Sequence, residues 1–190
     1  MKLPFTRILI VVAMLACAAA PLRAENKPYK RTVESYSLPD VTLINQDGKK
    51  VRLQSIMQSD KLVVVDFIFG TCTTICPILS VGYSNLQRKL GPDTNKVHLI
   101  SISIDPEHDT PKIMKEYLKR YQAKPGWDFL TGSRSDINKV MYALNAYIPN
   151  KMSHYPLTLF RPAGNNKWIR IFGLMNSTEF LEETKKAGLK

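Results

Sequence analysis

Hydrophobic and polar positions along this chain separate predicted strands from predicted helices. Two runs, residues 61–69 and 97–104, are rich in β-branched residues and almost wholly apolar. That pattern is typical of central strands covered on both faces. Shorter apolar runs at 127–130, 157–160 and 168–172 predict three further strands. A Gly-containing turn separates the last two, so we expect them to pair antiparallel.

The segments between these strands carry apolar residues at every third or fourth position, as amphipathic helices do. The first predicted helix begins at Pro77 and is stopped by the Gly-Pro pair at 91–92. The next has Thr110 as its N-cap and Pro111 as its first helical residue. Two more helices are predicted over residues 135–146 and 177–186.

A short segment before the first central strand predicts a hairpin, because Asp47-Gly48 lies between alternating apolar runs. After it, strands and helices alternate, which predicts a parallel sheet with right-handed crossovers. An antiparallel pair and a terminal helix close the order, as in thioredoxin. The sequence therefore predicts an α/β protein with a thioredoxin-like fold and an N-terminal β-hairpin extension.

The first 24 residues differ from the rest of the chain. Lys2 and Arg7 precede an apolar run at 8–20, and small residues lead to a cleavage site after Ala24. This is the pattern of a signal peptide, and the run is shorter than the roughly 20 residues that span a bilayer. Retention as an N-terminal membrane anchor and lipidation at Cys17 are alternatives. We expect an exported protein of the periplasm or cell envelope, either free or attached to the inner membrane.

Length and charge limit the remaining possibilities. The chain of 190 residues is one domain in size, and we expect residues 25–34 to form a polar tether before a domain over 35–190. Its 27 Lys and Arg against 16 Asp and Glu give a net charge of +11. The cations are scattered and no nucleic-acid-binding motif is present, so we expect no nucleic acid partner. A basic surface suits an acidic protein or anionic lipid.

Two of the three cysteines, Cys72 and Cys76, stand four residues apart where the first central strand turns into a helix. Ligands of open α/β sheets bind at such strand ends. Cys76 lies close to a helix N-terminus, whose partial positive charge favours thiolate. In a helical turn the two Cβ atoms are about 5–6 Å apart. That spacing permits a redox-active disulfide or two thiolates on one soft metal ion.

Histidines supply the candidate third ligand. His98 lies within an apolar strand and His108 in a polar loop, where structural and solvated roles are expected. His154 precedes the strand at 157–160, and in a thioredoxin-like fold this loop faces the helix that carries the cysteines. Two thiolates and an imidazole suit copper, as Cu(I) and Cu(II), whereas structural zinc takes four protein ligands.

These motifs resemble the SCO/SenC family over residues 35–185. The similarity rests on C-x-x-x-C-P after a central strand, SIDPEHDTP at 103–111, WDFLTG at 127–132 and a later His. Members are thioredoxin-like copper proteins linked to assembly of the CuA centre of cytochrome c oxidase. The resemblance implies Cys72, Cys76 and His154 as copper ligands. It also implies that Asp105 and Asp109 either support the ligands or dock a partner.

The chain departs from the family pattern around its third ligand. Ser153 stands where many members have Asp, and Pro156 interrupts the approach to the next strand. Both changes affect how His154 is aimed. Met152 offers a thioether, which is another soft copper ligand.

Three functions use these residues. The first is a metallochaperone, not an enzyme, that delivers copper to the CuA site of cytochrome c oxidase or to a related copper enzyme; its partners are a copper-receiving oxidase subunit and a thiol reductant. The second is a thiol-disulfide oxidoreductase that keeps a partner's copper-site cysteines reduced. The third is a peroxidase, because residues 73–76 match the T-x-x-C of peroxiredoxins, although Phe69 stands where that family has Pro.

Overall fold

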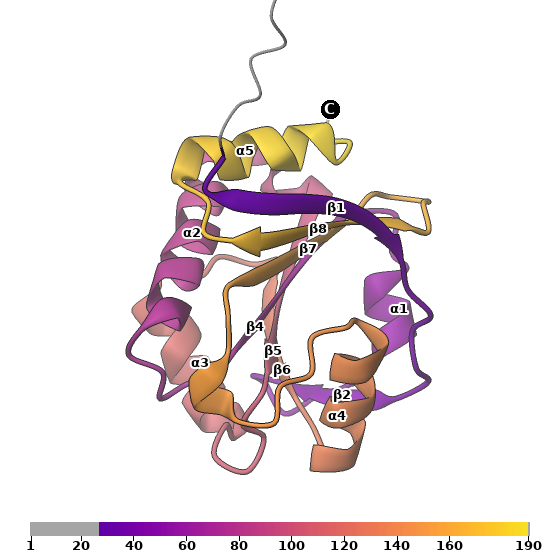
Figure 1. Cartoon of the computed structure of the whole chain (residues 1–190). Helices are drawn as coiled ribbons and strands as arrows, with labels where there is room; N and C mark the ends of the chain where they lie inside the picture. Colours follow the sequence, from indigo (N-terminus) through magenta and orange to yellow (C-terminus); the bar gives the residue numbers. More distant parts are fainter. Residues whose placement is uncertain (1–26, 190) are drawn as a thin grey trace, which may run out of the picture.

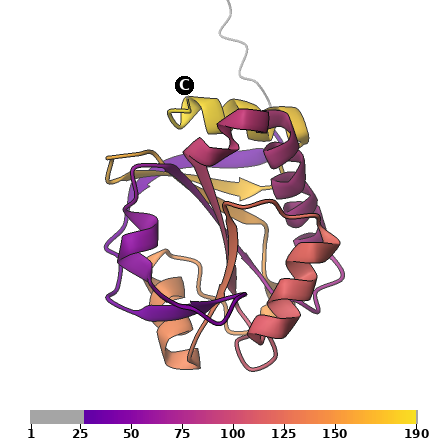
Figure 2. The ribbon, with the colours of Figure 1, turned by 180° about the vertical axis from the view of Figure 1, so that it is seen from behind.

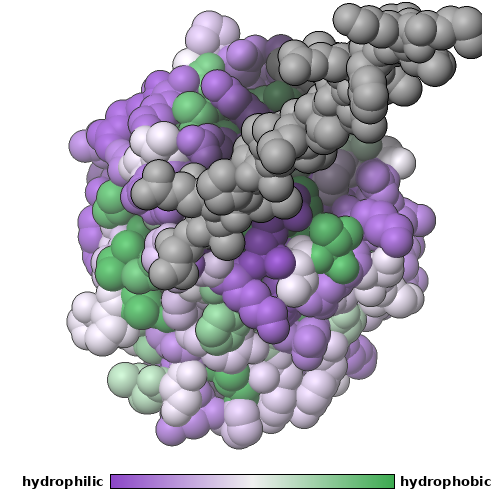
Figure 3. All heavy atoms as spheres, turned by 45° about the horizontal axis from the view of Figure 1, so that its top comes forward, coloured by the Kyte–Doolittle hydropathy of each residue, from purple (hydrophilic) through white to green (hydrophobic). Residues whose placement is uncertain are grey.

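The computed structural model describes residues 27–189 (Figure 1). The predicted signal peptide or anchor at 1–24 lies outside these residues, as does Cys17. Within 27–189, no helix has the length and apolar character needed to cross a membrane. The face that carries α5 (Ser177–Lys186) is mostly hydrophilic where described residues form it, with hydrophobic residues scattered among them (Figure 3).

One eight-stranded mixed sheet forms the centre of the molecule, in the order β1-β8-β7-β4-β5-β6-β2-β3. Strands β4, β5 and β6 are parallel, and all other neighbours are antiparallel. The strands are β1 (Tyr29–Ser35), β2 (Thr42–Asn45), β3 (Lys50–Arg52), β4 (Leu62–Ile68), β5 (Val97–Ser103), β6 (Trp127–Thr131), β7 (Leu157–Arg161) and β8 (Lys167–Gly173).

Helices cover both faces of this sheet, as Figures 1 and 2 show from opposite sides. Besides α5, the helices are α1 (Leu53–Met57), α2 (Ile75–Leu90), α3 (Pro111–Arg120), α4 (Arg134–Ala143) and the 3-10 helices η1 (Gly91–Lys96) and η2 (Lys151–Ser153). Helices α2, α3 and α5 pack on one face of the sheet, and α1 and α4 pack on the other. The buried apolar side chains form one cluster around the central strands, which explains why β4 is buried at every position.

Strand direction brings three loops together at one end of the central strands. β4 and β5 are parallel, so the loops that follow them both lie at the carboxyl ends of these strands. β7 runs antiparallel to β4, with Asp66 opposite Thr158, so the segment before β7 lies at the same end. The cysteine loop, the acidic loop at 104–110 and the His154 segment therefore meet.

The predicted fold is confirmed, including the hairpin of β2 and β3, which turns at Gly48 with φ of 74°. Thr110 caps α3 by accepting a hydrogen bond from the backbone of Ile113. Helix α1 was not predicted; it is a five-residue helix with only two buried side chains.

The prediction of a polar tether over 25–34 is wrong for residues 29–34. These residues form most of β1, which pairs over seven residues with β8 at the edge of the sheet. A buried carboxylate, Glu183 of α5, holds the strand in place: it accepts hydrogen bonds from Arg31 at 2.9 Å and Tyr29 at 3.1 Å. Two polar side chains of β1 thus have a partner about 150 residues away in the sequence.

Candidate metal centre

Three predicted ligands converge at the carboxyl ends of β4 and β5, where the loops meet. Cys72 lies in the loop after β4, Cys76 is the second residue of α2, and His154 follows η2. Their ligand atoms all lie within 4.8 Å of one another. His154 Nε2 is 3.1 Å from Cys76 Sγ and 3.7 Å from Cys72 Sγ. Both cysteines are free thiols and both are buried, so two sulfurs and one nitrogen face a shared, sheltered point.

The imidazole of His154 is held by its other nitrogen. Nδ1 is 2.7 Å from the backbone oxygen of Lys151, and only a protonated Nδ1 forms a hydrogen bond to a carbonyl. Nε2 is then left with its lone pair, the form that binds metal. Burial lowers the pKa of His154 and so favours the neutral ring. The Phe69 ring packs against the imidazole in a T-shaped arrangement, with 5.1 Å between the ring centroids, and restricts its orientation further.

The two thiols differ in acidity. Burial opposes ionisation of Cys72, but hydrogen bonds from Cys76, Thr74 and nearby backbone N–H groups outweigh it and lower its pKa. Burial raises the pKa of Cys76, and the neighbouring Cys72 adds to the effect. This rise is opposite in direction to the expected effect of the helix N-terminus on Cys76, and its main cause is that the side chain of Cys76 is fully buried.

Asp109 supports the cysteine loop from behind. Its Oδ1 accepts a hydrogen bond from the backbone of Gly70 at 3.0 Å, and its Oδ2 accepts one from Ser103 at 2.5 Å. A Cβ at Gly70 would lie 2.8 Å from Asp109 Oδ1, so only glycine permits this contact. The carboxylate thus fixes the chain two residues before Cys72.

Asp105 supports the histidine loop in a similar way. It is 3% exposed and forms an ion pair with Lys151, whose backbone oxygen holds His154. His108 Nδ1 lies 3.0 Å from its other oxygen. These contacts lower the pKa of Asp105 despite its burial. Both aspartates thus contact the loops that bear the three candidate ligands, and neither belongs to the triad itself.

Other candidates lie apart from the triad. His98 pairs with Asp128 at 2.8 Å on neighbouring strands, which fits the expected structural role. His108 has a largely exposed side chain on the acidic loop. Met152 is 71% exposed on η2. Sequence reasoning missed Lys151, whose backbone and side chain both take part; its position three residues before His154 was the only available signal.

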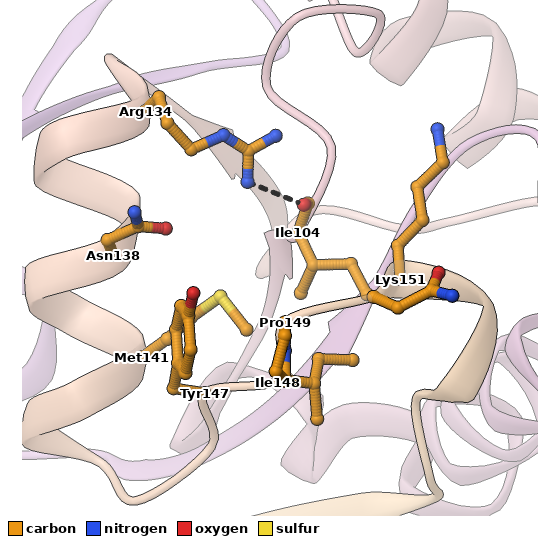
Figure 4. A pocket seen from close by; sticks show the side chains of 9 residues that line it. Ile104, Arg134, Asn138, Met141, Tyr147, Ile148, Pro149 and Lys151 are labelled. Carbon is orange, nitrogen blue, oxygen red and sulfur yellow. Dashed lines mark hydrogen bonds between the residues drawn. The ribbon is translucent and has the colours of Figure 1, made fainter.

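A cavity of about 360 Å³ lies beside the triad, between α4 and the segment that leads to Lys151 (Figure 4). Arg134 lines one side and donates from Nη1 to the backbone oxygen of Ile104 at 3.0 Å. The side chains of Met141 and Ile148 give the cavity an apolar part. It shares Ile104 and Ile148 with a smaller cavity next to His154. The larger cavity thus borders Lys151, at the start of the loop that carries His154.

A thioredoxin-like sheet with two thiols and an imidazole at the ends of its central strands defines a class of candidate metal-binding proteins. Comparison with known proteins identifies the family within this class. The family model SCO1/SenC matches residues 30–159, and the chain belongs to this family. The predicted resemblance is thereby confirmed.

Several relatives give the extent of the similarity. The SCO1 protein homolog of Bacillus subtilis is 40% identical over 115 residues, which cover 60% of this chain and 58% of the relative. The chain thus spans somewhat over half of that relative's length. A SCO2-like protein of Rickettsia typhi is 29% identical, with 92% of this chain and 88% of the relative covered.

Solved structures agree with the fold. BsSco, described as a member of the Sco family of cytochrome c oxidase assembly proteins with a disulfide switch, matches with a TM-score of 0.67 and 30% identity over 82% of this chain and 95% of its own. Bradyrhizobium japonicum ScoI with copper bound matches with a TM-score of 0.64 and 28% identity, over 80% of this chain and 99% of its own.

Proposed function

We propose that this protein is a copper metallochaperone of the cell envelope that delivers copper to the CuA site of cytochrome c oxidase or to a related copper enzyme. The observation that carries the proposal is the convergence of Cys72, Cys76 and His154 within 4.8 Å. Copper-bound structures among the similar Sco proteins support copper as the metal.

The donor set suits a cargo that must be bound and then released. Two thiolates hold Cu(I), and the imidazole nitrogen improves the site for Cu(II). Each thiol gives up its proton when it binds copper. Cys72 and Cys76 would supply the two thiolates and His154 Nε2 the nitrogen. Three protein ligands leave room for a donor from a receiving protein.

Asp105 and Asp109 would serve as positioning residues in this function. Asp109 holds the backbone at Gly70, and Asp105 holds Lys151. Because neither touches the triad, their role is to keep both ligand loops in register while copper enters and leaves.

The proposal also sets the environment and the partners. An exported protein meets an oxidising compartment, so a thiol reductant must keep Cys72 and Cys76 reduced. The receiving partner is a copper-binding oxidase subunit. Residues 1–24 would direct export and, if retained, would anchor the chain to the inner membrane.

A thiol-disulfide oxidoreductase is the second candidate. The observation that favours it is the pair of free thiols, Cys72 and Cys76, whose Sγ atoms lie within 4.8 Å of each other, because two neighbouring thiols suit thiol-disulfide exchange. This function needs Cys72 and Cys76 and does not need His154.

The variant His154→Ala separates the two candidates. Cu(I) should remain bound through Cys72 and Cys76, whereas Cu(II) affinity should fall at least tenfold because the imidazole is lost. Cu(II) binding is followed by its thiolate charge-transfer absorption, Cu(I) by competition with a chelator, and thiol exchange by reaction with a model disulfide. His98→Ala is the matched control, because His98 lies away from the triad.

Assembly in cells completes the test. A chaperone with His154→Ala should fail to support oxidase assembly although its thiol exchange is unchanged. Full assembly with this variant would contradict the chaperone and favour the oxidoreductase. Unchanged Cu(II) binding would contradict His154 as the third ligand.

A further inference from the structure

A second polar cavity lies at the opposite end of the sheet from the metal centre. Its volume is about 540 Å³, and it is bordered by the chain between β1 and β2, by α1 and by the strands β7 and β8. Arg161, which lines it, pairs with Val63 at the start of β4, whereas Cys72 follows the end of β4. The length of β4 puts about 20 Å between the two sites.

Arg161 is buried without an acidic partner. It is 5% exposed, and no carboxylate pairs with it among residues 27–189. The only hydrogen bond of its side chain among residues 27–189 runs from Nη1 to the backbone oxygen of Ser59 at 3.0 Å. The Nε and Nη2 donors are thus unused. Burial alone lowers the pKa of Arg161, as expected for a cation without a counter-ion.

A neighbouring arginine shows how unusual this is. Arg170, on the adjacent strand β8, is also buried, at 9% exposure. Its guanidinium donates to Tyr36 Oη and to the backbone oxygens of Leu144 and Asn145, and Glu34 lies 3.9 Å away. Buried charged groups normally have such partners. Arg161 lacks them and faces a cavity instead.

The rest of the lining suits an anion. Within the described residues, no Asp or Glu lines the cavity, whereas hydroxyl and amide groups do, from Ser35, Ser37, Gln58 and Asn166. Near Arg161, the hydroxyl of Ser59 is buried and has no hydrogen-bond partner in the described part of the chain. The Nε–Nη2 edge of a guanidinium binds carboxylate or phosphate through two parallel hydrogen bonds.

We infer that this cavity is a binding site for a small oxyanion, a carboxylate or a phosphate, which Arg161 holds through Nε and Nη2. The hydroxyl and amide groups of the lining supply further hydrogen bonds. Because Arg161 is recessed, the ligand is a free small molecule that enters the cavity. This site is independent of copper binding.

Inorganic phosphate and acetate are the probes for calorimetric titration of the purified protein. We expect saturable binding of at least one of them, weakened at least tenfold in Arg161→Met, which keeps the apolar part of the side chain. The control Lys167→Met removes an exposed cation from β8 and should leave binding unchanged. Copper binding should be unchanged in both variants. Absence of saturable binding, or equal binding by Arg161→Met, would overturn the inference.

A second variant keeps Arg161 and so avoids loss of the fold. Gln58→Glu places a carboxylate in the cavity, which should neutralise Arg161, abolish phosphate and acetate binding and raise the melting temperature. Undiminished binding by this variant would contradict the site. A phospholipid headgroup is another source of a phosphate group that Arg161 could bind. Co-sedimentation of the wild type, but not Arg161→Met, with phosphatidylglycerol vesicles and without binding of free phosphate would contradict a free ligand.

Discussion

Two carboxylates, Glu183 and Asp66, are fully buried in this protein, yet their surroundings differ completely. Glu183 accepts hydrogen bonds from Tyr29, Arg31, Lys27 and Lys186, which lower its pKa despite burial. Neither oxygen of Asp66 makes a hydrogen bond of good geometry among residues 27–189, and burial raises its pKa to about 7 although the nearby Ser101 hydroxyl lowers it. Burial therefore does not determine whether a carboxyl is charged; the cations around it do.

The largest effect we expect comes from Asp66. Its pKa rises from 3.8 to about 7 on folding, so the folded state retains this proton more tightly. The contribution of Asp66 to the free energy of unfolding should be most favourable below pH 4, fall as the pH rises to 7 and then level off. The total is about 4 kcal/mol. Asp66→Asn cannot ionise and should lack this decrease.

Denaturant unfolding of the reduced, copper-free protein between pH 4 and 8 measures this difference. Asp60→Asn is the control, since it removes an exposed carboxylate close to the start of β4. Parallel pH profiles for the wild type and Asp66→Asn would contradict the assignment.

Glu183→Gln should change the free energy of unfolding by less than the ionisation of Asp66 does. The cause is also opposite, because Glu183 is a carboxylate that neighbouring cations stabilise, whereas burial destabilises the charged form of Asp66. The substitution removes the charge to which Lys27, Tyr29 and Arg31 donate hydrogen bonds, at a cost of about 2 kcal/mol. The loss should appear first in β1, as faster amide hydrogen exchange over Tyr29–Ser35. Glu182→Gln, an exposed neighbour on α5, should leave exchange unchanged. Unaltered exchange in β1 of Glu183→Gln would show that pairing with β8 alone holds the strand.

Asp105→Asn tests the same rule beside the metal centre and should be the smallest change in stability, about 1 kcal/mol. Asp105 is charged because Lys151 and His108 surround it. Its loss should free Lys151 and weaken Cu(II) binding severalfold while Cu(I) binding, which rests on the thiols, stays close to wild type. The control Glu107→Gln removes an exposed acid of the same loop. Equal loss of both copper ions would contradict a role through His154.

The sequence predicted the parts of the fold that depend on local pattern. Strands β4 and β5 have near-continuous apolar runs, and α5 was predicted over its full range. The convergence of Cys72 and Cys76 followed from their spacing, and that of His154 followed from the fold plan. The parts it missed depend on distant residues. β1 has no apolar alternation and is held by Glu183, and the acidity of Cys76 depends on how deeply α2 buries it.

The position of β1 also has a mechanical consequence. Two strands, β8 and β7, stand between β1 and β4, the strand that leads to Cys72. A pulling force applied to the chain at Lys27 acts first on the seven paired residues of β1 and on their contacts with Glu183. Such a force would disrupt the pairing of β1 with β8 first, and it would not act directly on the strand that positions the three ligands.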